Sequence, residues 1–180
     1  WMVPKAKSQV YLGDNAVPKE YARSYTEDFK AWCETDTKDL VRRDFNHPSV
    51  ILWSIGNEIE WTFPYYSTTY NAVNGKQEYN SYTPEYDSLI IRTAFNKLAL
   101  PVDSLVLTAE KLVKWVKEID TSRPTTIGSV HPSVGLAAGL GNAVDVMGFN
   151  YRAVEYDKAH KHYPNLKFLG SENWGSWSEW

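Results

Sequence analysis

Four short apolar segments alternate with helical segments from residue 50 onward, and this alternation constrains the fold more than any other feature of the sequence. The apolar segments are 50–55, 125–128, 144–149 and 167–170. Between them lie segments with apolar residues at helical spacing, of which 105–119 is the clearest. Strands that alternate with helices in this way are typical of a parallel α/β sheet.

The first apolar segment shows the strand pattern best. Residues 50–55 are Val-Ile-Leu-Trp-Ser-Ile, a run that is too short for a core helix and rich in β-branched and aromatic residues. We therefore predict a strand that is buried on both faces and ends at Gly56-Asn57-Glu58. Residues 61–86 are rich in Tyr, Asn, Ser and Thr without any period, so a long excursion over the rim of the domain is expected there.

Helices are predicted between the strands. The capping box Ser24-Tyr25-Thr26-Glu27 marks the start of one helix, which should end near Arg43. Further helices are expected over 105–119, around 134–138 and over 154–162.

Composition excludes several classes of function. The 19 Lys and Arg are scattered among 22 Asp and Glu, so the chain lacks the basic patch that a nucleic-acid binder needs. No run of about 18 apolar residues is present, which argues against a membrane span. Cys33 is the only cysteine, so neither a disulfide nor a cysteine metal site is expected. The compartment stays open, with the periplasm or the extracellular space favoured over the cytoplasm.

The candidate functional residues follow the predicted strands, because active sites of parallel α/β folds lie at the carboxyl ends of the strands. These positions hold Asn57-Glu58, His131, Asn150-Tyr151 and Glu172-Asn173. Two Glu residues in such places fit glycoside hydrolysis, since a retaining enzyme needs one protonated and one ionised carboxyl about 5–5.5 Å apart. Taken alone, each residue is more often a helix cap, a turn residue or a half-buried ring, so the surrounding sequence has to decide.

Two longer segments supply that context. Residues 43–58, Arg-Asp-Phe-Asn-His-Pro-Ser-Val-Ile-Leu-Trp-Ser-Ile-Gly-Asn-Glu, resemble the acid/base segment of glycoside hydrolase family 2, the family of β-galactosidases, β-glucuronidases and β-mannosidases. Gly148-Phe149-Asn150-Tyr151 and residues 168–175 resemble the sixth and seventh strands of the same catalytic barrel. Together with Arg123-Pro124 before a strand, the likeness covers most of the chain from Trp32 onward.

The resemblance implies a role for each candidate residue. Glu58 would be the general acid and then the base, and Asn57 would bind the sugar 2-hydroxyl. Glu172 would be the nucleophile, and Tyr151 would donate to it and keep it ionised. Further substrate contacts are expected, on weaker grounds, from His131, Trp174 and Trp177.

The fold that the resemblance implies is α/β, a partial (β/α)8 TIM barrel of about four parallel strands, from after the third strand to after the seventh. Residues 1–180 would form one incomplete catalytic barrel domain, because a whole barrel needs about 250 residues. Four strands leave two sheet edges open, so the missing barrel portion or self-association should cover them. Little or no turnover is therefore expected from the isolated chain.

The function implied is that of a retaining β-glycosidase that acts on a β-linked sugar or oligosaccharide without a cofactor or metal. The context of residues 170–173 favours a β-galactosidase. His160-Lys161-His162 does not suggest a metal site, because two His at this spacing on a helix point to different faces. The alternative is a non-catalytic carbohydrate-binding or structural fragment of a larger glycosidase.

Overall fold

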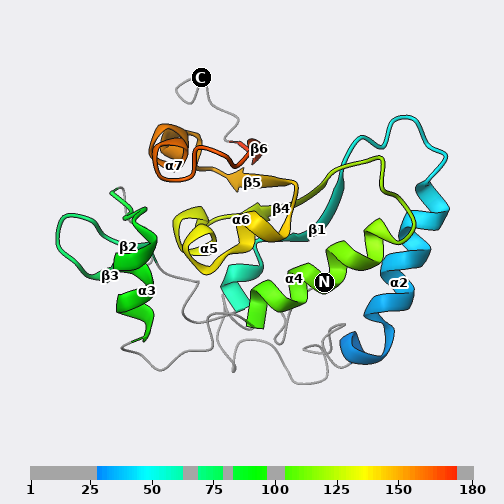
Figure 1. Cartoon of the computed structure of the whole chain (residues 1–180), viewed down its shortest axis with the longest axis horizontal. Helices are drawn as coiled ribbons and strands as arrows, with labels where there is room; N and C mark the ends of the chain where they lie inside the picture. The colour runs from blue at the N-terminus through cyan, green and yellow to red at the C-terminus, as the bar shows by residue number, and fades with distance from the viewer. Residues whose placement is uncertain (1–27, 63–68, 79–82, 97–103, 174–180) are drawn as a thin grey trace, which may run out of the picture.

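The centre of the fold is a parallel sheet of four strands in the order β1-β4-β5-β6 (Figure 1). The computed structural model describes residues 28–62, 69–78, 83–96 and 104–173. The strands of the sheet are β1 (Trp53–Asn57), β4 (Thr125–Ser129), β5 (Val146–Asn150) and β6 (Phe168–Glu172). Their order in space is their order in the chain, as in a barrel built by successive strand-helix units.

Helices precede and connect the strands and cover one face of the sheet (Figure 1). They are α2 (Phe29–Asp44), α4 (Ser104–Lys117), α5 (Pro132–Ala138), α6 (Leu140–Ala143), the 3-10 turn η2 (Ala153–Glu155) and α7 (Tyr156–His162). Within the described ranges, none of the helices has the length and apolarity that crossing a membrane requires.

The core lies between the sheet and this helical layer because alternate strand residues point to opposite faces. Trp53, Ile55, Ile127, Met147 and Phe149 are buried in one apolar cluster with the inner sides of the helices. The opposite face carries small or polar residues, among them the glycine pair Gly128 and Gly148, which are partners in the register of β4 and β5. The sheet thus has one apolar face and one face with room for polar groups.

The predicted partial α/β barrel is confirmed in its strands and helices, with one correction to the first strand. β1 begins at Trp53 and not at Val50, and Ile51 before it is 77% exposed. Burial on both faces is wrong for β1, since Ser54 is exposed while Trp53 and Ile55 are buried. The reason is that β1 pairs only with β4 among the described strands, whereas every residue of β4, which has neighbours on both sides, is buried.

The predicted helices over 105–119, 134–138 and 154–162 correspond to α4, to α5 and to η2 with α7. The helix predicted to end near Arg43 is α2, which ends at Asp44. Its predicted capping box at residues 24–27 lies outside the described residues.

The excursion after β1 contains more regular structure than the sequence suggested. The 3-10 turn η1 (Ile59–Thr62) follows β1, and β2 (Thr69–Tyr70) pairs antiparallel with β3 (Gln77–Glu78). A helix that the sequence analysis missed, α3 (Ser88–Asn96), comes next. The Asp87 carboxylate accepts from the Leu89 amide at 2.8 Å, so an ordinary N-cap signal stood in the sequence.

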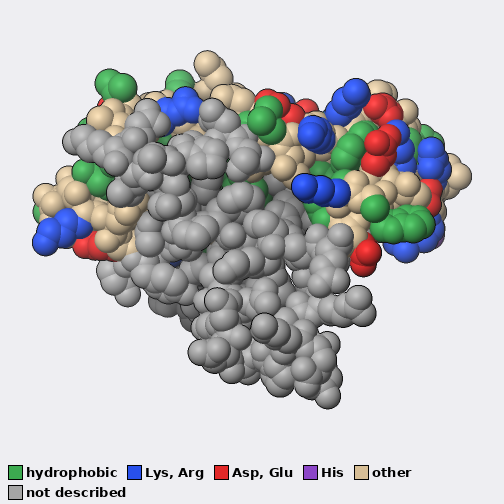
Figure 2. All heavy atoms as spheres, turned by 90° about the horizontal axis from the view of Figure 1, so that it is seen from below, with side chains coloured by type: hydrophobic (Ala, Val, Ile, Leu, Met, Phe, Trp, Pro, Cys, Tyr) green, Lys and Arg blue, Asp and Glu red, His purple; other side chains and the backbone are tan. Residues whose placement is uncertain are grey.

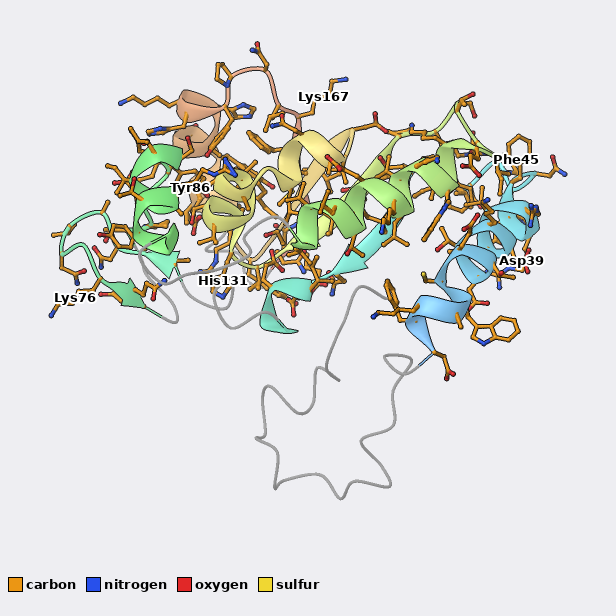
Figure 3. All side chains as sticks on the ribbon, turned by 60° about the horizontal axis from the view of Figure 1, so that its bottom comes forward. Asp39, Phe45, Lys76, Tyr86, His131 and Lys167 are labelled. Carbon is orange, nitrogen blue, oxygen red and sulfur yellow. The ribbon has the colours of Figure 1, made fainter. Side chains whose placement is uncertain are left out.

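The β2–β3 hairpin and α3 lie together at one side of the molecule and pack against α5 (Figure 1). The hydroxyl of Tyr86, just before α3, donates to the buried Glu155 carboxylate at 2.6 Å. Figure 3 shows Tyr86 lying inside the structure between α3 and α5. The excursion is therefore fixed to the turn after β5, close to the carboxyl end of the sheet.

The opposite end of the sheet is held by a buried carboxylate. Asp120, after α4, accepts from the Trp53 indole at 2.8 Å and from the Arg123 guanidinium at 2.7 Å. Burial would raise the pKa of Asp120, but hydrogen bonds from Ser122, Arg123 and Trp53 outweigh it and hold that pKa below its ordinary value. Arg123 also donates to the Val50 carbonyl at 2.6 Å, so this cluster ties the entry of β1 to the entry of β4.

We expect Asp120→Asn to lower the free energy of unfolding by about 3 kcal/mol, because it leaves Arg123 and its buried surroundings without the compensating charge. The matched control is Asp39→Asn, which removes another Asp–Arg pair at the same i,i+3 spacing, but on the exposed surface of α2. Its expected cost is under about 1 kcal/mol. Urea unfolding followed by Trp fluorescence measures both, and equal costs would contradict the role given to Asp120.

Figure 2 shows that the charges over the end of the molecule where α2 lies are of both signs and interspersed.

Candidate active site

Parallel pairing brings the predicted site residues to one edge of the sheet. Glu58 follows the last residue of β1, Asn150 is the last residue of β5, and Glu172 is the last residue of β6. Asn57 pairs in register with Gly128, and Asn150 pairs with Glu172. Residues far apart in the sequence therefore share the carboxyl edge, where ligands of parallel sheets bind.

Two of these residues have a left-handed backbone that side chains rarely adopt. Glu58 has φ 46° and Tyr151 has φ 59°, each directly after a strand. The Glu58 amide donates to the Gly128 carbonyl at 2.8 Å, and the Tyr151 amide donates to the Glu172 carbonyl at 2.8 Å. The neighbouring strand thus holds each strained turn in place, and such strain is concentrated at functional sites.

A short hydrogen bond joins two of the predicted residues, Tyr151 and Glu172. The Tyr151 hydroxyl donates to Glu172 Oε2 at 2.6 Å. This hydrogen bond raises the pKa of Tyr151, with smaller contributions from burial and from the negative charges of Glu172 and Glu58. The same phenol therefore senses both carboxylates, and it stays protonated as a donor.

A polar layer joins the carboxyl ends of β1, β5 and β6. The Asn150 amide nitrogen donates to Asn57 Oδ1 at 2.9 Å and to Glu58 Oε1 at 3.3 Å. The Ser171 hydroxyl donates to Asn150 Oδ1 at 2.6 Å. Glu58 is 9% exposed and Asn150 is fully buried, whereas Asn57 and Ser171 are exposed, so the layer has a buried centre and reaches the surface at both ends.

His131 lies beside this layer at the start of α5, in the region between the β2–β3 hairpin and η1 in the view of Figure 3. Its side chain is fully buried. Burial, together with the charge of Arg152 and against the opposing charge of Glu58, lowers the pKa of His131 to about 4. His131 is therefore neutral at pH 7 and can act there as a hydrogen-bonding group but not as a cation.

Glu60 is a buried carboxyl group that the sequence analysis missed. It lies in η1, is fully buried, and accepts from the Ser129 hydroxyl. The pKa of Glu60 is raised to about 7, mainly by burial and also by the nearby charge of Glu58, and hydrogen bonds from Ser129 and from the backbone of His131 oppose this rise. No periodicity or motif distinguished Glu60, because its burial depends on β4 and α5, which are distant in the sequence.

The structure brings four of the seven predicted residues, Asn57, Glu58, Tyr151 and Glu172, to the same edge, with His131 next to them. Trp174 and Trp177 lie outside the described residues. The sequence analysis placed Asn150 among the strand-end residues without giving it a role, and it missed Ser171, although the rule of strand ends also points to it. Among the described residues no group of three or more His, Cys, Asp or Glu could hold a metal ion.

The arrangement offers two carboxyl groups in different surroundings, which is the requirement for using one as an acid and the other as an anion. Glu172 is partly exposed and accepts a hydrogen bond from the Tyr151 hydroxyl. Glu58 is mostly covered and contacts an amide.

Comparisons with known proteins show the family of the chain. Residues 12–168 match the family model described as glycosyl hydrolases family 2, TIM barrel domain. The chain is 30% identical over 163 residues to the β-galactosidase BoGH2A of Bacteroides ovatus, and the match covers 86% of this chain but only 17% of that protein. A match of 41 residues, 42% identical, covers 23% of this chain and 4% of a putative β-glucuronidase of Formosa agariphila.

Solved structures give the same result. A glycosyl hydrolase family 2 member from Bacteroides cellulosilyticus superposes with a TM-score of 0.55 at 25% identity. The superposition covers 87% of this chain and 16% of that one. The chain therefore spans about a sixth of the length of the relatives that it matches.

Glu60→Gln should change how stability depends on pH. The carboxyl keeps its proton more strongly in the folded state, so the free energy of unfolding should fall as pH rises from about 4.5 to about 7 and then level off. Glutamine cannot ionise and should remove this fall, which is on the order of 3 kcal/mol for such a shift. Urea unfolding at pH 4 and pH 8 measures it, and Glu60→Gln should be the more stable protein at pH 8. Parallel pH curves for the two proteins would contradict the assignment.

Proposed function

Because this chain belongs to family 2 of the glycosyl hydrolases, we propose that it supplies the acid/base and the nucleophile of a retaining β-glycosidase. The observation that carries the proposal is the hydrogen bond from Tyr151 to Glu172, next to a strand end that presents Glu58. The phenol holds one oxygen of Glu172 in place, and a nucleophile requires such an orientation.

The reaction proceeds in two displacements at the same sugar carbon. In the first, Glu172 attacks the anomeric carbon while Glu58 transfers its proton to the departing glycosidic oxygen, and a glycosyl ester forms on Glu172. In the second, Glu58 removes a proton from water, which attacks the same carbon and releases Glu172. Asn57 binds the 2-hydroxyl next to the reacting carbon, where contacts strengthen toward the transition state.

A β-linked galactoside is the substrate class favoured by the relatives, since BoGH2A is a β-galactosidase and its match covers 86% of this chain. The group that leaves would lie toward the β2–β3 hairpin and α3, because these elements pack against α5 beside His131. An aglycone with several sugars would find its contacts there.

The isolated 180-residue chain would hold substrate only weakly. A closed (β/α)8 barrel holds substrate with loops from all eight strands, and the sheet described here has four. The relatives are also far longer than this chain. The rest of the barrel, or a second copy of the chain, would have to cover the open edges of the sheet.

The full-length protein that carries this sequence should hydrolyse an aryl β-galactoside, and Glu172→Gln should lower kcat by more than about 10³-fold because the nucleophile is lost. Glu110→Gln, the same change on the exposed surface of α4, is the matched control and should leave the activity unchanged. A 2-deoxy-2-fluoro-β-galactosyl fluoride should label Glu172, detected by mass spectrometry of the peptide. Binding of the sugar without labelling would instead support a non-catalytic carbohydrate-binding role.

The isolated chain should show little or no turnover of the same aryl β-galactoside, although both carboxyl groups are present. Initial rates at equal concentrations of the full-length protein and of the 180-residue chain measure the difference. A comparable rate in the isolated chain, abolished by Glu172→Gln, would show that the remaining strands are not needed.

A further inference from the structure

We propose that Asn150, held by Ser171, is a positioning residue that determines which oxygen of Glu58 carries the catalytic proton. The inference rests on the function proposed above and concerns how the acid/base is prepared for its step. It starts from the polar layer of Asn57, Glu58, Asn150 and Ser171, in which every hydrogen bond has a defined direction.

The hydrogen bonds run in one direction through the layer, from Ser171 in β6 through Asn150 to the end of β1. The Ser171 hydroxyl donates to Asn150 Oδ1 at 2.6 Å, so this oxygen is an acceptor. The amide nitrogen of Asn150 must then face β1, where it donates to Asn57 Oδ1 at 2.9 Å and to Glu58 Oε1 at 3.3 Å. Its two hydrogens match these two acceptors, and the buried amide has no solvent with which to exchange them.

The consequence for Glu58 follows from the fact that an amide N–H can only donate. Glu58 Oε1 is kept as an acceptor in both protonation states, so the proton of the acid form resides on Oε2. Proton transfer to the leaving group requires the acid hydrogen at one defined place within hydrogen-bond reach of the glycosidic oxygen. Asn150 therefore orients the acid without touching the substrate.

The same hydrogen bonds also orient Asn57. Because Asn57 Oδ1 accepts from Asn150, the amide nitrogen of Asn57 is directed away from the layer. That nitrogen is the group which would donate to the sugar 2-hydroxyl. A single buried amide thus sets the donor and acceptor pattern of both residues at the end of β1.

Two glycines provide the space that this layer occupies. A Cβ atom at Gly128 would lie 2.5 Å from Asn57 Oδ1 and 3.0 Å from Asn150 Oδ1. A Cβ atom at Gly148 would lie 2.5 Å from the Ser171 hydroxyl oxygen and 2.8 Å from the Ile127 carbonyl oxygen. Gly128 and Gly148 are partners in the β4–β5 register, so adjacent strands both lack a side chain beneath the layer.

The test is Asn150→Asp in the full-length protein, an isosteric change that replaces the donor by a second acceptor facing Glu58. We expect kcat/KM for phenyl β-galactoside, whose poor leaving group needs the acid, to fall by tenfold to a hundredfold, on the order of a partial loss of general acid catalysis. For 2,4-dinitrophenyl β-galactoside, whose leaving group needs no proton, the change should stay within about threefold. The alkaline limb of the phenyl profile should also move to higher pH, because the added negative charge raises the pKa of Glu58.

Two further variants make the result decisive. Asn142→Asp introduces the same change at an exposed position of α6 and should behave like the parent protein. Ser171→Ala leaves Asn150 in place but removes its orienting donor, so it should cause a smaller loss selective for the phenyl substrate. If circular dichroism shows that Asn150→Asp does not fold, Ser171→Ala alone tests the positioning role of Asn150.

Equal losses on both substrates in Asn150→Asp and in Ser171→Ala, or no loss on either, would overturn the positioning role and leave the proposed function intact. A parent protein that hydrolyses neither substrate and is not labelled at Glu172 by 2-deoxy-2-fluoro-β-galactosyl fluoride would overturn the proposed function, and this inference with it.

Discussion

Parallel pairing of four strands in chain order is the constraint on which the candidate site depends. It brings the ends of β1 and β6 to one edge although Glu58 and Glu172 are more than a hundred residues apart in the sequence. The pairing also fixes the turns after the strands, because the amides of Glu58 and Tyr151 donate hydrogen bonds to carbonyl groups of the adjacent strand. Side chains that emerge from such turns have little freedom to move apart.

The two faces of the sheet differ in composition: one is apolar and packs in the core, and the other has glycine and polar residues. One face buries Ile127, Met147 and Phe149 against the helices in the apolar core. The other face has glycine at positions 128 and 148. Because Gly128 and Gly148 have no side chain, the polar side chains of the layer can lie close to the strands there. The polar layer of the candidate site therefore lies on the face of the sheet opposite to the apolar core.

Much of this could be predicted from the sequence because local patterns determine it. Strands and helices follow from apolar runs and spacing, and the rule of strand ends located Glu58, Tyr151 and Glu172. The limits of β1 and the helix α3 were missed, since the first depends on Pro124 and Arg123 as partners and the second on an Asp87 cap that was passed over. Glu60 and the directed hydrogen bonds of Asn150 depend on contacts between distant segments, which no single-sequence pattern contains.

The hydrogen bond between Tyr86 and Glu155 fixes one end of the excursion and leaves the other part free to vary in sequence. It fastens the far end of the excursion to the turn after β5, while the hairpin tip around Gly75 stays exposed. Substitutions at the tip can therefore change the surface of the hairpin while the Tyr86–Glu155 hydrogen bond keeps the start of α3 attached to the turn after β5. The attachment of the excursion and the sequence of its tip are thus independent of each other.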